Sequence, residues 1–143
     1  MAKRFKDWKY PKFDKKGMTK WNWMCQNSDN LKLGNYVDIG AFTYINAKAG
    51  VELEEQVQIG SHCSIYSIST IDNKKGKILI KKNAKVGSHS IIMPGITIGE
   101  NSIIGAFSFV NKDIPPNIMA YGMPAKVIKK IGIKKRGLGN EYD

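Results

Sequence analysis

The chain has 143 residues, of which 42% are hydrophobic and 24% are charged. This composition suits one globular domain and excludes a disordered chain. No apolar run is long enough to cross a bilayer and no apolar leader follows the first residues, so we expect no membrane span, no secretory signal and a cytoplasmic location. The net charge of +11 is concentrated at the two ends.

The two basic ends restrict the kind of partner. Residues 1–20 hold eight Lys or Arg against two Asp, and residues 126–143 hold six against two acidic residues. Nucleic acid and a phosphate-rich small molecule are both conceivable partners, and lysines that only keep the chain soluble are the simplest alternative. Cys25 and Cys63 form no CxxC pair, so we expect two reduced thiols and no metal site.

Residues 1–30 form a basic segment that is rich in aromatic side chains. A repetitive fold needs a cap over its exposed first coil, so we expect these rings to be buried there. Stacking on the base of a nucleotide is the functional alternative. The aromatic residues are Phe5, Trp8, Tyr10, Phe13, Trp21 and Trp23.

A period of six residues runs through residues 31–115. An aliphatic residue recurs every sixth position, and a small or aliphatic residue follows most of them after four positions. The phase slips near Gly50, and a polar loop is predicted at 72–77. The aliphatic series comprises Leu33, Ile39, Ile45, Leu53, Ile59, Ile65, Ile71, Ile80, Val86, Ile92, Ile98, Ile104 and Val110.

This period fits neither a helix, which repeats at three and four residues, nor a flat strand, which alternates. It fits short strands joined by tight corners, with one large and one small side chain of each strand pointing inward. Three such strands per coil, stacked coil on coil, would bury a continuous core. We therefore predict an all-β parallel β-helix over 31–115, followed by a C-terminal segment and tail over 116–143.

Residues 31–131 resemble the hexapeptide-repeat acyltransferases. The resemblance is carried by Ile39–Cys63, Val86–Gly99, Gly105–Pro115 and Gly122–Ile128. It implies a left-handed β-helix, a homotrimer with active sites between subunits, and acetyl-CoA as the acyl donor. The left-handed winding comes from the resemblance alone, because parallel crossovers are usually right-handed.

Two histidines occupy equivalent corner positions, His62 in Gly60-Ser61-His62 and His89 in Gly87-Ser88-His89. Acyl transfer to a hydroxyl or amine needs a base, and histidine titrates near neutral pH. By resemblance, His89 is the catalytic base. His62 could orient the acceptor, bind a sugar phosphate, serve as the base instead, or be a plain surface residue. A backbone N–H at a Gly-rich corner would stabilise the oxyanion.

The remaining site residues are expectations for the acceptor and for CoA. Asn46 and Asp72 are available to hold His89 or the acceptor, and Tyr66 is expected at the acceptor. Small residues would let pantetheine approach the backbone, and basic residues would bind the CoA phosphates, which explain the basic C-terminus better than nucleic acid does. These CoA residues are Gly87, Gly105, Ala106, Lys112, Lys126 and Lys129.

The favoured function is acetyl transfer to a sugar by direct attack, with the amino group of a nucleotide-linked amino sugar slightly preferred. O-acetylation of a sugar hydroxyl is the alternative. A zinc hydratase on the same solenoid would need three histidine ligands, and the chain has two histidines. A solenoid that binds nucleic acid without catalysis is a further, weaker hypothesis.

Overall fold

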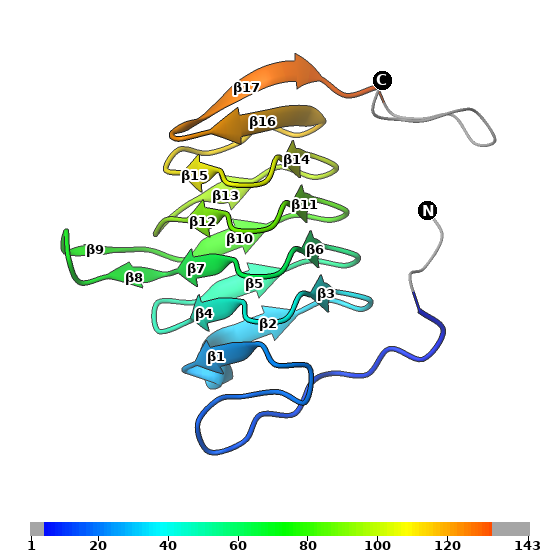
Figure 1. The fold of residues 1–143 in the computed structure, drawn as a ribbon, viewed down its shortest axis with the longest axis vertical. Helices are drawn as coiled ribbons and strands as arrows, with labels where there is room; N and C mark the ends of the chain where they lie inside the picture. Colours follow the sequence, from blue (N-terminus) through cyan, green and yellow to red (C-terminus); the bar gives the residue numbers. More distant parts are fainter. Residues whose placement is uncertain (1–4, 133–143) are drawn as a thin grey trace.

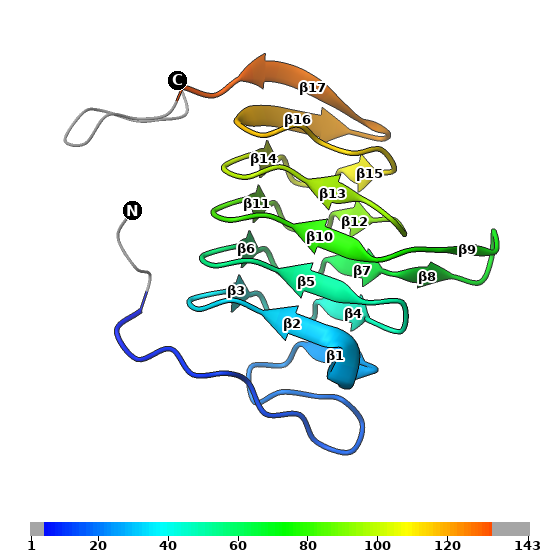
Figure 2. The same cartoon turned by 180° about the vertical axis from the view of Figure 1, so that it is seen from behind.

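The structure is a computed structural model that describes residues 5–132. Its strands wind into a three-sided solenoid, with the coils stacked along the long axis in Figures 1 and 2. The predicted all-β, left-handed parallel β-helix is confirmed. Within the described residues no helix is long and apolar enough to cross a membrane.

Three sheets form the three sides, and their strands are parallel apart from the last one, β17. Within the coils, the chain passes from one sheet to the next. The first sheet contains β1 (Met24–Gln26), β4 (Tyr44–Asn46), β7 (Ser64–Tyr66), β12 (Ile91–Ile92) and β15 (Phe109–Val110). The second contains β2 (Leu31–Leu33), β5 (Val51–Leu53), β10 (Ile78–Ile80) and β13 (Thr97–Ile98). The third contains β3 (Asp38–Ile39), β6 (Gln58–Ile59), β11 (Lys85–Val86), β14 (Ile103–Ile104), β16 (Ile118–Gly122) and β17 (Ala125–Lys130).

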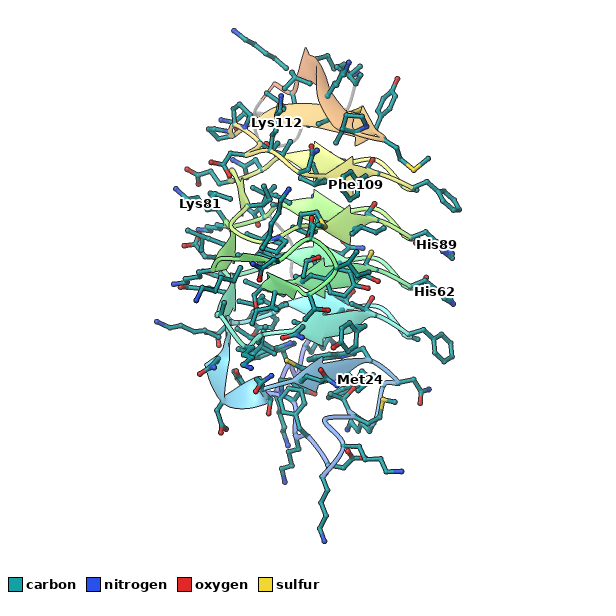
Figure 3. The ribbon with its side chains drawn as sticks, turned by 90° about the vertical axis from the view of Figure 1, so that its left-hand side faces the viewer. Met24, His62, Lys81, His89, Phe109 and Lys112 are labelled. Carbon is teal, nitrogen blue, oxygen red and sulfur yellow. The ribbon has the colours of Figure 1, made fainter. Side chains whose placement is uncertain are left out.

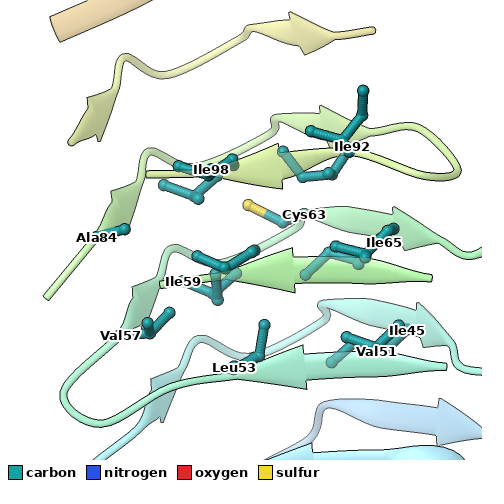
Figure 4. Packing of buried hydrophobic residues seen from close by; sticks show 14 of the residues in the cluster. Ile45, Val51, Leu53, Val57, Ile59, Cys63, Ile65, Ala84, Ile92 and Ile98 are labelled. Atoms are coloured by element: carbon teal, nitrogen blue, oxygen red, sulfur yellow. The ribbon is translucent and has the colours of Figure 1, made fainter. Parts of the chain in front are cut away.

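The core consists of aliphatic columns inside the solenoid. Strand register places Ile45, Ile65, Ile92 and Val110 one above another in the first sheet, each fully buried. Figure 4 shows this interdigitated packing. Burying one such side chain stabilises the fold by about 1.5–3 kcal/mol, so the six-residue period is the main determinant of this fold.

The prediction for Ile71 was wrong. Its side chain is 99% exposed, because the chain leaves the solenoid after β7. It forms a hairpin of β8 (Ile68–Ser69) and β9 (Lys74–Lys75), which are antiparallel and project from the side of the molecule in Figure 1. The predicted polar loop at 72–77 is therefore partly strand, and the inward pattern resumes at Ile78, which is fully buried.

The solenoid extends beyond the predicted limits of 31 and 115. At its start, β1 already pairs with β4, and a short 3-10 helix (Ser28–Asn30) leads into β2. At its end, β16 pairs in parallel with β14 and then in antiparallel fashion with β17. The predicted tail from residue 133 onward lies outside the described residues.

The N-terminal segment covers the first coil in part. Trp23 is buried in the core, and Phe13 packs against it edge-on with ring centroids 5.5 Å apart. Trp8 donates its indole N–H to the Val37 carbonyl oxygen at 2.7 Å. Trp21 and Tyr10 stay about half exposed, so the predicted burial holds for some of these rings only. In Figure 2 the segment loops beneath the first coil and continues along its side.

Candidate active site

The candidate site lies at the corner where each coil passes from the third sheet to the first. Four successive coils place one residue there with a left-handed backbone, namely Phe42, His62, His89 and Phe107, and Asn22 has the same backbone at the turn that leads into β1, with φ between 58° and 66°. Such angles are uncommon for residues other than glycine. Strand register aligns the four coils, so these four side chains form one column, which we call the corner column, along one edge of the solenoid.

Backbone hydrogen bonds join each of these corners to the one below. The His62 N–H donates to the Ala41 carbonyl oxygen at 3.0 Å, the His89 N–H to that of Ser61 at 3.0 Å, and the Phe107 N–H to that of Ser88 at 2.9 Å. The repeated bond fixes the offset between neighbouring corners. Equivalent side chains consequently leave the backbone in the same direction.

The rings of the corner column stack on each other. The His62 and His89 imidazoles have centroids 4.7 Å apart and planes only 6° apart. The rings of His89 and Phe107 lie 4.8 Å apart with planes 4° apart. Phe42 meets His62 at 5.1 Å with a tilt of 39°. Figure 3 shows both imidazoles one above the other, pointing away from the solenoid.

The corner column is open to solvent. Both imidazoles are exposed, and Phe42 and Phe107 are 64% and 63% exposed. Within residues 5–132 no group is hydrogen-bonded to either imidazole ring. An exposed imidazole with free nitrogens can accept a proton from an incoming nucleophile.

The residues predicted to hold His89 or the acceptor lie elsewhere in this chain. Asn46 and Tyr66 are register partners at the far ends of their strands from the corner column. The Asn46 carboxamide oxygen accepts the Lys48 N–H, and Tyr66 packs against Tyr44 with centroids 5.8 Å apart. Within one subunit, neither one meets the imidazoles.

Asp72 lies near the tip of the β8–β9 hairpin, with its carboxylate 3.6 Å from the Lys74 ammonium. A hydrogen bond from the Ser69 side chain, and then the nearby Lys74 charge, lower the pKa of the Asp72 carboxyl. The carboxylate is thus satisfied within the hairpin. A role for Asp72 at the acceptor remains a prediction that would require another subunit.

The small residues predicted at pantetheine have a packing role here. A Cβ on Gly87 would lie 2.5 Å from the Ala106 backbone nitrogen, and one on Gly105 would lie 2.8 Å from the Tyr121 Cβ. These glycines therefore let successive coils approach each other. Ala106 is exposed beside Phe107, so of the three it is the one that presents an open surface to a ligand.

The basic residues predicted at the CoA phosphates lie on the last coils. Lys112 follows β15, while Lys126 and Lys129 belong to β17, and all three are exposed. Register pairs Lys126 with Tyr121 and Lys129 with Met119. Exposed lysines act as point charges toward a phosphate, with an attraction that salt screens.

The two thiols are free, as predicted, and both are buried. Burial raises the pKa of Cys25 to about 12 and also raises the pKa of Cys63. A thiol must ionise to act as a nucleophile. Neither buried thiol is therefore poised to act as a nucleophile, whereas both imidazoles are exposed.

Sequence reasoning did not find the ring stack. Phe42 and Phe107 occupy the same place after the corner glycine as the two histidines, at Gly40-Ala41-Phe42 and Gly105-Ala106-Phe107. That shared position was the available signal.

A pocket of about 430 Å³ between the N-terminal segment and β3, lined by Asp7, Trp21 and Trp23 among others, was also not predicted.

Comparison with known proteins agrees with this class of solenoid. Residues 77–112 match the family model described as bacterial transferase hexapeptide (six repeats). Galactoside O-acetyltransferase of Escherichia coli (strain K12) is 38% identical over 113 residues, which cover 68% of this chain and 56% of that protein. A maltose O-acetyltransferase from Clostridium difficile 630 superposes with a TM-score of 0.72 at 33% identity, covering 78% of this chain and 65% of that one.

Two further structures contain ligands. A hexapeptide-repeat acetyltransferase from Vibrio cholerae, complexed with acetyl coenzyme A, has a TM-score of 0.72 at 25% identity and covers 76% of this chain and 64% of that one. A mutant of the Bacillus cereus N-acyltransferase AntD, in complex with dTDP and coenzyme A, has a TM-score of 0.63 at 25% identity. The match covers 83% of this chain and 81% of that one.

The fold and these matches define a left-handed β-helix of hexapeptide repeats. Residues 77–112 match the hexapeptide-repeat transferase family model, and the similarity to its acetyltransferases agrees with the resemblance predicted from the sequence. It spans little more than half the length of the Escherichia coli relative.

Proposed function

We propose that this protein is an acetyl-CoA-dependent acetyltransferase whose acceptor is a sugar. The observation that carries the proposal is the exposed His89 imidazole at a corner of a hexapeptide solenoid. Its relatives are named as sugar acetyltransferases, and one structural neighbour binds acetyl coenzyme A. The exposed lysines of β17 complement the phosphates of such a donor.

His89 acts as the general base. Its free ring nitrogen takes the proton from the acceptor as the acceptor atom forms a bond to the acetyl carbon. As the carbon–sulfur bond of the thioester breaks, the imidazolium returns this proton to the departing sulfur, so no net proton is consumed. Base catalysis by a positioned side chain contributes roughly 10²–10⁴-fold to rate.

The acceptor atom is a hydroxyl oxygen or an amino nitrogen. O-acetylation is supported by the relatives of higher identity, at 38% and 33%. N-acetylation of a nucleotide-linked amino sugar is supported by the N-acyltransferase with dTDP, because this chain covers 81% of its length. We favour the sugar hydroxyl on identity and keep the amino sugar as the second candidate.

A homotrimer with its sites between subunits accompanies this proposal. Support comes from the open corner column, where within the described chain nothing covers the edges of the imidazoles. A neighbouring subunit would enclose the site and exclude water. Light scattering would give a mass near three times 16.0 kDa for a trimer, and a monomeric mass at working concentration would contradict the assembly.

The function is tested by incubating the purified chain with acetyl-CoA and a panel of sugars, free and nucleotide-linked, while thiol release is followed. Mass spectrometry of the product would show the added acetyl group. Mild alkali removes an O-acetyl ester and leaves an N-acetyl amide, so it identifies the acceptor atom. The proposal fails if no sugar stimulates thiol release and the chain does not bind CoA.

A further inference from the structure

We propose that His62 and Phe107 are positioning residues that hold the His89 imidazole between them by stacking on its two faces. The inference rests on the proposed role of His89 as the base. In this proposal His62 acts through the stacking of its ring, and it is neither a second base nor a contact to the acceptor. It also assigns a function to Phe107, which the reaction itself does not use.

The geometry covers both faces of the His89 ring. His62 lies on one face at 4.7 Å and Phe107 on the other at 4.8 Å, with the three planes parallel to within a few degrees. An imidazole carries its two nitrogens on its edge. With both faces covered, the edge is the part of His89 that remains open to an acceptor.

The stack provides what a hydrogen bond provides in other bases. A catalytic base is usually oriented by a third group that bonds to its second nitrogen. Residues 5–132 supply His89 with no such bond, and an exposed side chain without one exchanges between rotamers. Two flat neighbours prevent that rotation, because any change of χ1 would drive the ring out of the stack.

The solenoid itself sets the spacing of the rings. Neighbouring parallel strands lie about 4.8 Å apart, and the register aligns Ser64 with Ile91 and Ile91 with Phe109, just after the corners. The spacing between side chains at neighbouring corners therefore matches the centroid separation of two stacked aromatic rings. Phe42, whose ring is tilted by 39° against that of His62, lies one coil further from His89 and outside the clamp.

His62 and Phe107 differ in chemistry and share a flat ring. A contact to the acceptor or a proton relay would need the nitrogen atoms of His62, which Phe107 cannot match. The symmetry of the two contacts around His89 thus favours stacking as the common role. The proposal can therefore be tested by replacing His62 either with another ring or with an amide and comparing the two variants.

The corner column offers matched substitutions. Phenylalanine occurs at this corner at positions 42 and 107, and asparagine has the same left-handed backbone at position 22. His62→Phe therefore keeps the ring and removes the nitrogens, whereas His62→Asn removes the ring and keeps a polar amide. Phe107→Asn is the counterpart above His89, and Phe42→Asn is the control one coil outside the clamp.

We expect His62→Asn and Phe107→Asn to lower kcat by roughly 10- to 100-fold, the scale of a misplaced catalytic group, with little change in KM for either substrate. His62→Phe and Phe42→Asn should keep most of kcat. If His62→Phe loses as much activity as His62→Asn, the nitrogens of His62 matter and the proposal is wrong. It is also wrong if both asparagine variants keep full kcat.

A second readout does not depend on turnover. Stacked rings shift the NMR resonances of the His89 ring protons through their ring currents, and His62→Asn or Phe107→Asn should move these resonances toward free-histidine positions. Unchanged resonances in both variants would overturn the clamp. If the stack is observed while His89→Asn has full activity, the clamp stands and the proposed role of His89 fails instead.

Discussion

Ser90 and Ser108 lie on neighbouring coils, each next to a residue of the corner column, and a hydrogen bond joins them. The backbone N–H of Ser108 donates to the Ser90 hydroxyl oxygen at 3.2 Å, and the Ser90 hydroxyl donates to the Gly105 carbonyl oxygen, also at 3.2 Å. Both serines are buried. Because Ser90 is bonded covalently to His89, this pair ties the candidate base to the coil above it.

The same arrangement recurs along the solenoid. The Thr43 hydroxyl donates to the Gly60 carbonyl oxygen at 2.9 Å and accepts the Cys63 N–H at 3.2 Å. The Ser108 hydroxyl accepts the Gly122 N–H at 3.1 Å. Each hydroxyl thus satisfies corner groups that would otherwise be buried without a partner.

Ser90→Ala should lower the free energy of unfolding by about 1–3 kcal/mol, since it leaves the buried Ser108 N–H unsatisfied. Urea denaturation followed by circular dichroism would measure the loss. Ser64→Ala is the control, because Ser64 lies on the outer face of β7 and is only half-buried. Equal losses in the two variants would show that the buried hydroxyl has no special role.

His89→Asn should reduce sugar-dependent thiol release by roughly 10²–10⁴-fold, the contribution typical of a general base. Asparagine already adopts this left-handed backbone at position 22, so the backbone should be undisturbed. CoA affinity, measured by calorimetry, should be unchanged. Turnover equal to that of the original chain would remove His89 from the mechanism.

Lys126→Ala should weaken CoA binding, and the affinity of the original chain should fall as salt rises, because both changes reduce the attraction between lysine and phosphate. Lys81→Ala is the control. Lys81 is also exposed, and it lies on the opposite side of the solenoid from the imidazoles in Figure 3. A larger effect at Lys81 than at Lys126 would place the phosphates elsewhere.

The buried thiols predict a pH dependence. Burial raises the pKa of Cys25 from 9.0 to about 12, so between these values an unfolded chain releases a proton that the folded chain retains. The resulting stability is fully present below pH 9 and is lost as pH rises toward 12. The urea midpoint of the original chain should therefore fall across this pH range. The midpoint of Cys25→Ala, compared with its own value at pH 8, should fall less.

A related measurement is alkylation at pH 8. Iodoacetamide should modify neither thiol at an appreciable rate in the folded chain, and should modify both in urea, since only the ionised and accessible thiol reacts. Mass spectrometry counts the modifications. Rapid labelling of folded protein would show that the coil around Cys25 or Cys63 opens readily.

The six-residue period predicted the inward columns because burial of aliphatic side chains dominates the fold, and Ile45, Ile65 and Ile92 are fully buried. It failed at Ile71, where the same spacing continues although the chain has left the solenoid. Periodicity records which residues could point inward, and it does not record where a coil is interrupted by a hairpin.

The corner column was harder to predict, because its members are unevenly spaced. Phe42, His62, His89 and Phe107 lie 20, 27 and 18 residues apart, since coils differ in length and one carries the β8–β9 hairpin. Their shared place after a corner glycine can be read in the sequence, whereas the stacking of these corners on each other depends on strand register. His89 could be named from its motif, whereas the rings on its two faces required the structure.

The antiparallel strand β17 at the end of the third sheet bears on whether these molecules associate end to end. A stack of parallel strands ends in a rim of unpaired backbone groups, which could template end-to-end polymerisation into filaments. Here the last strand of the third sheet runs antiparallel to β16, and it displays Lys126, Lys129 and Lys130 on exposed positions. A second molecule approaching this end would meet these exposed lysines, and the charges on an edge strand disfavour its pairing with another chain.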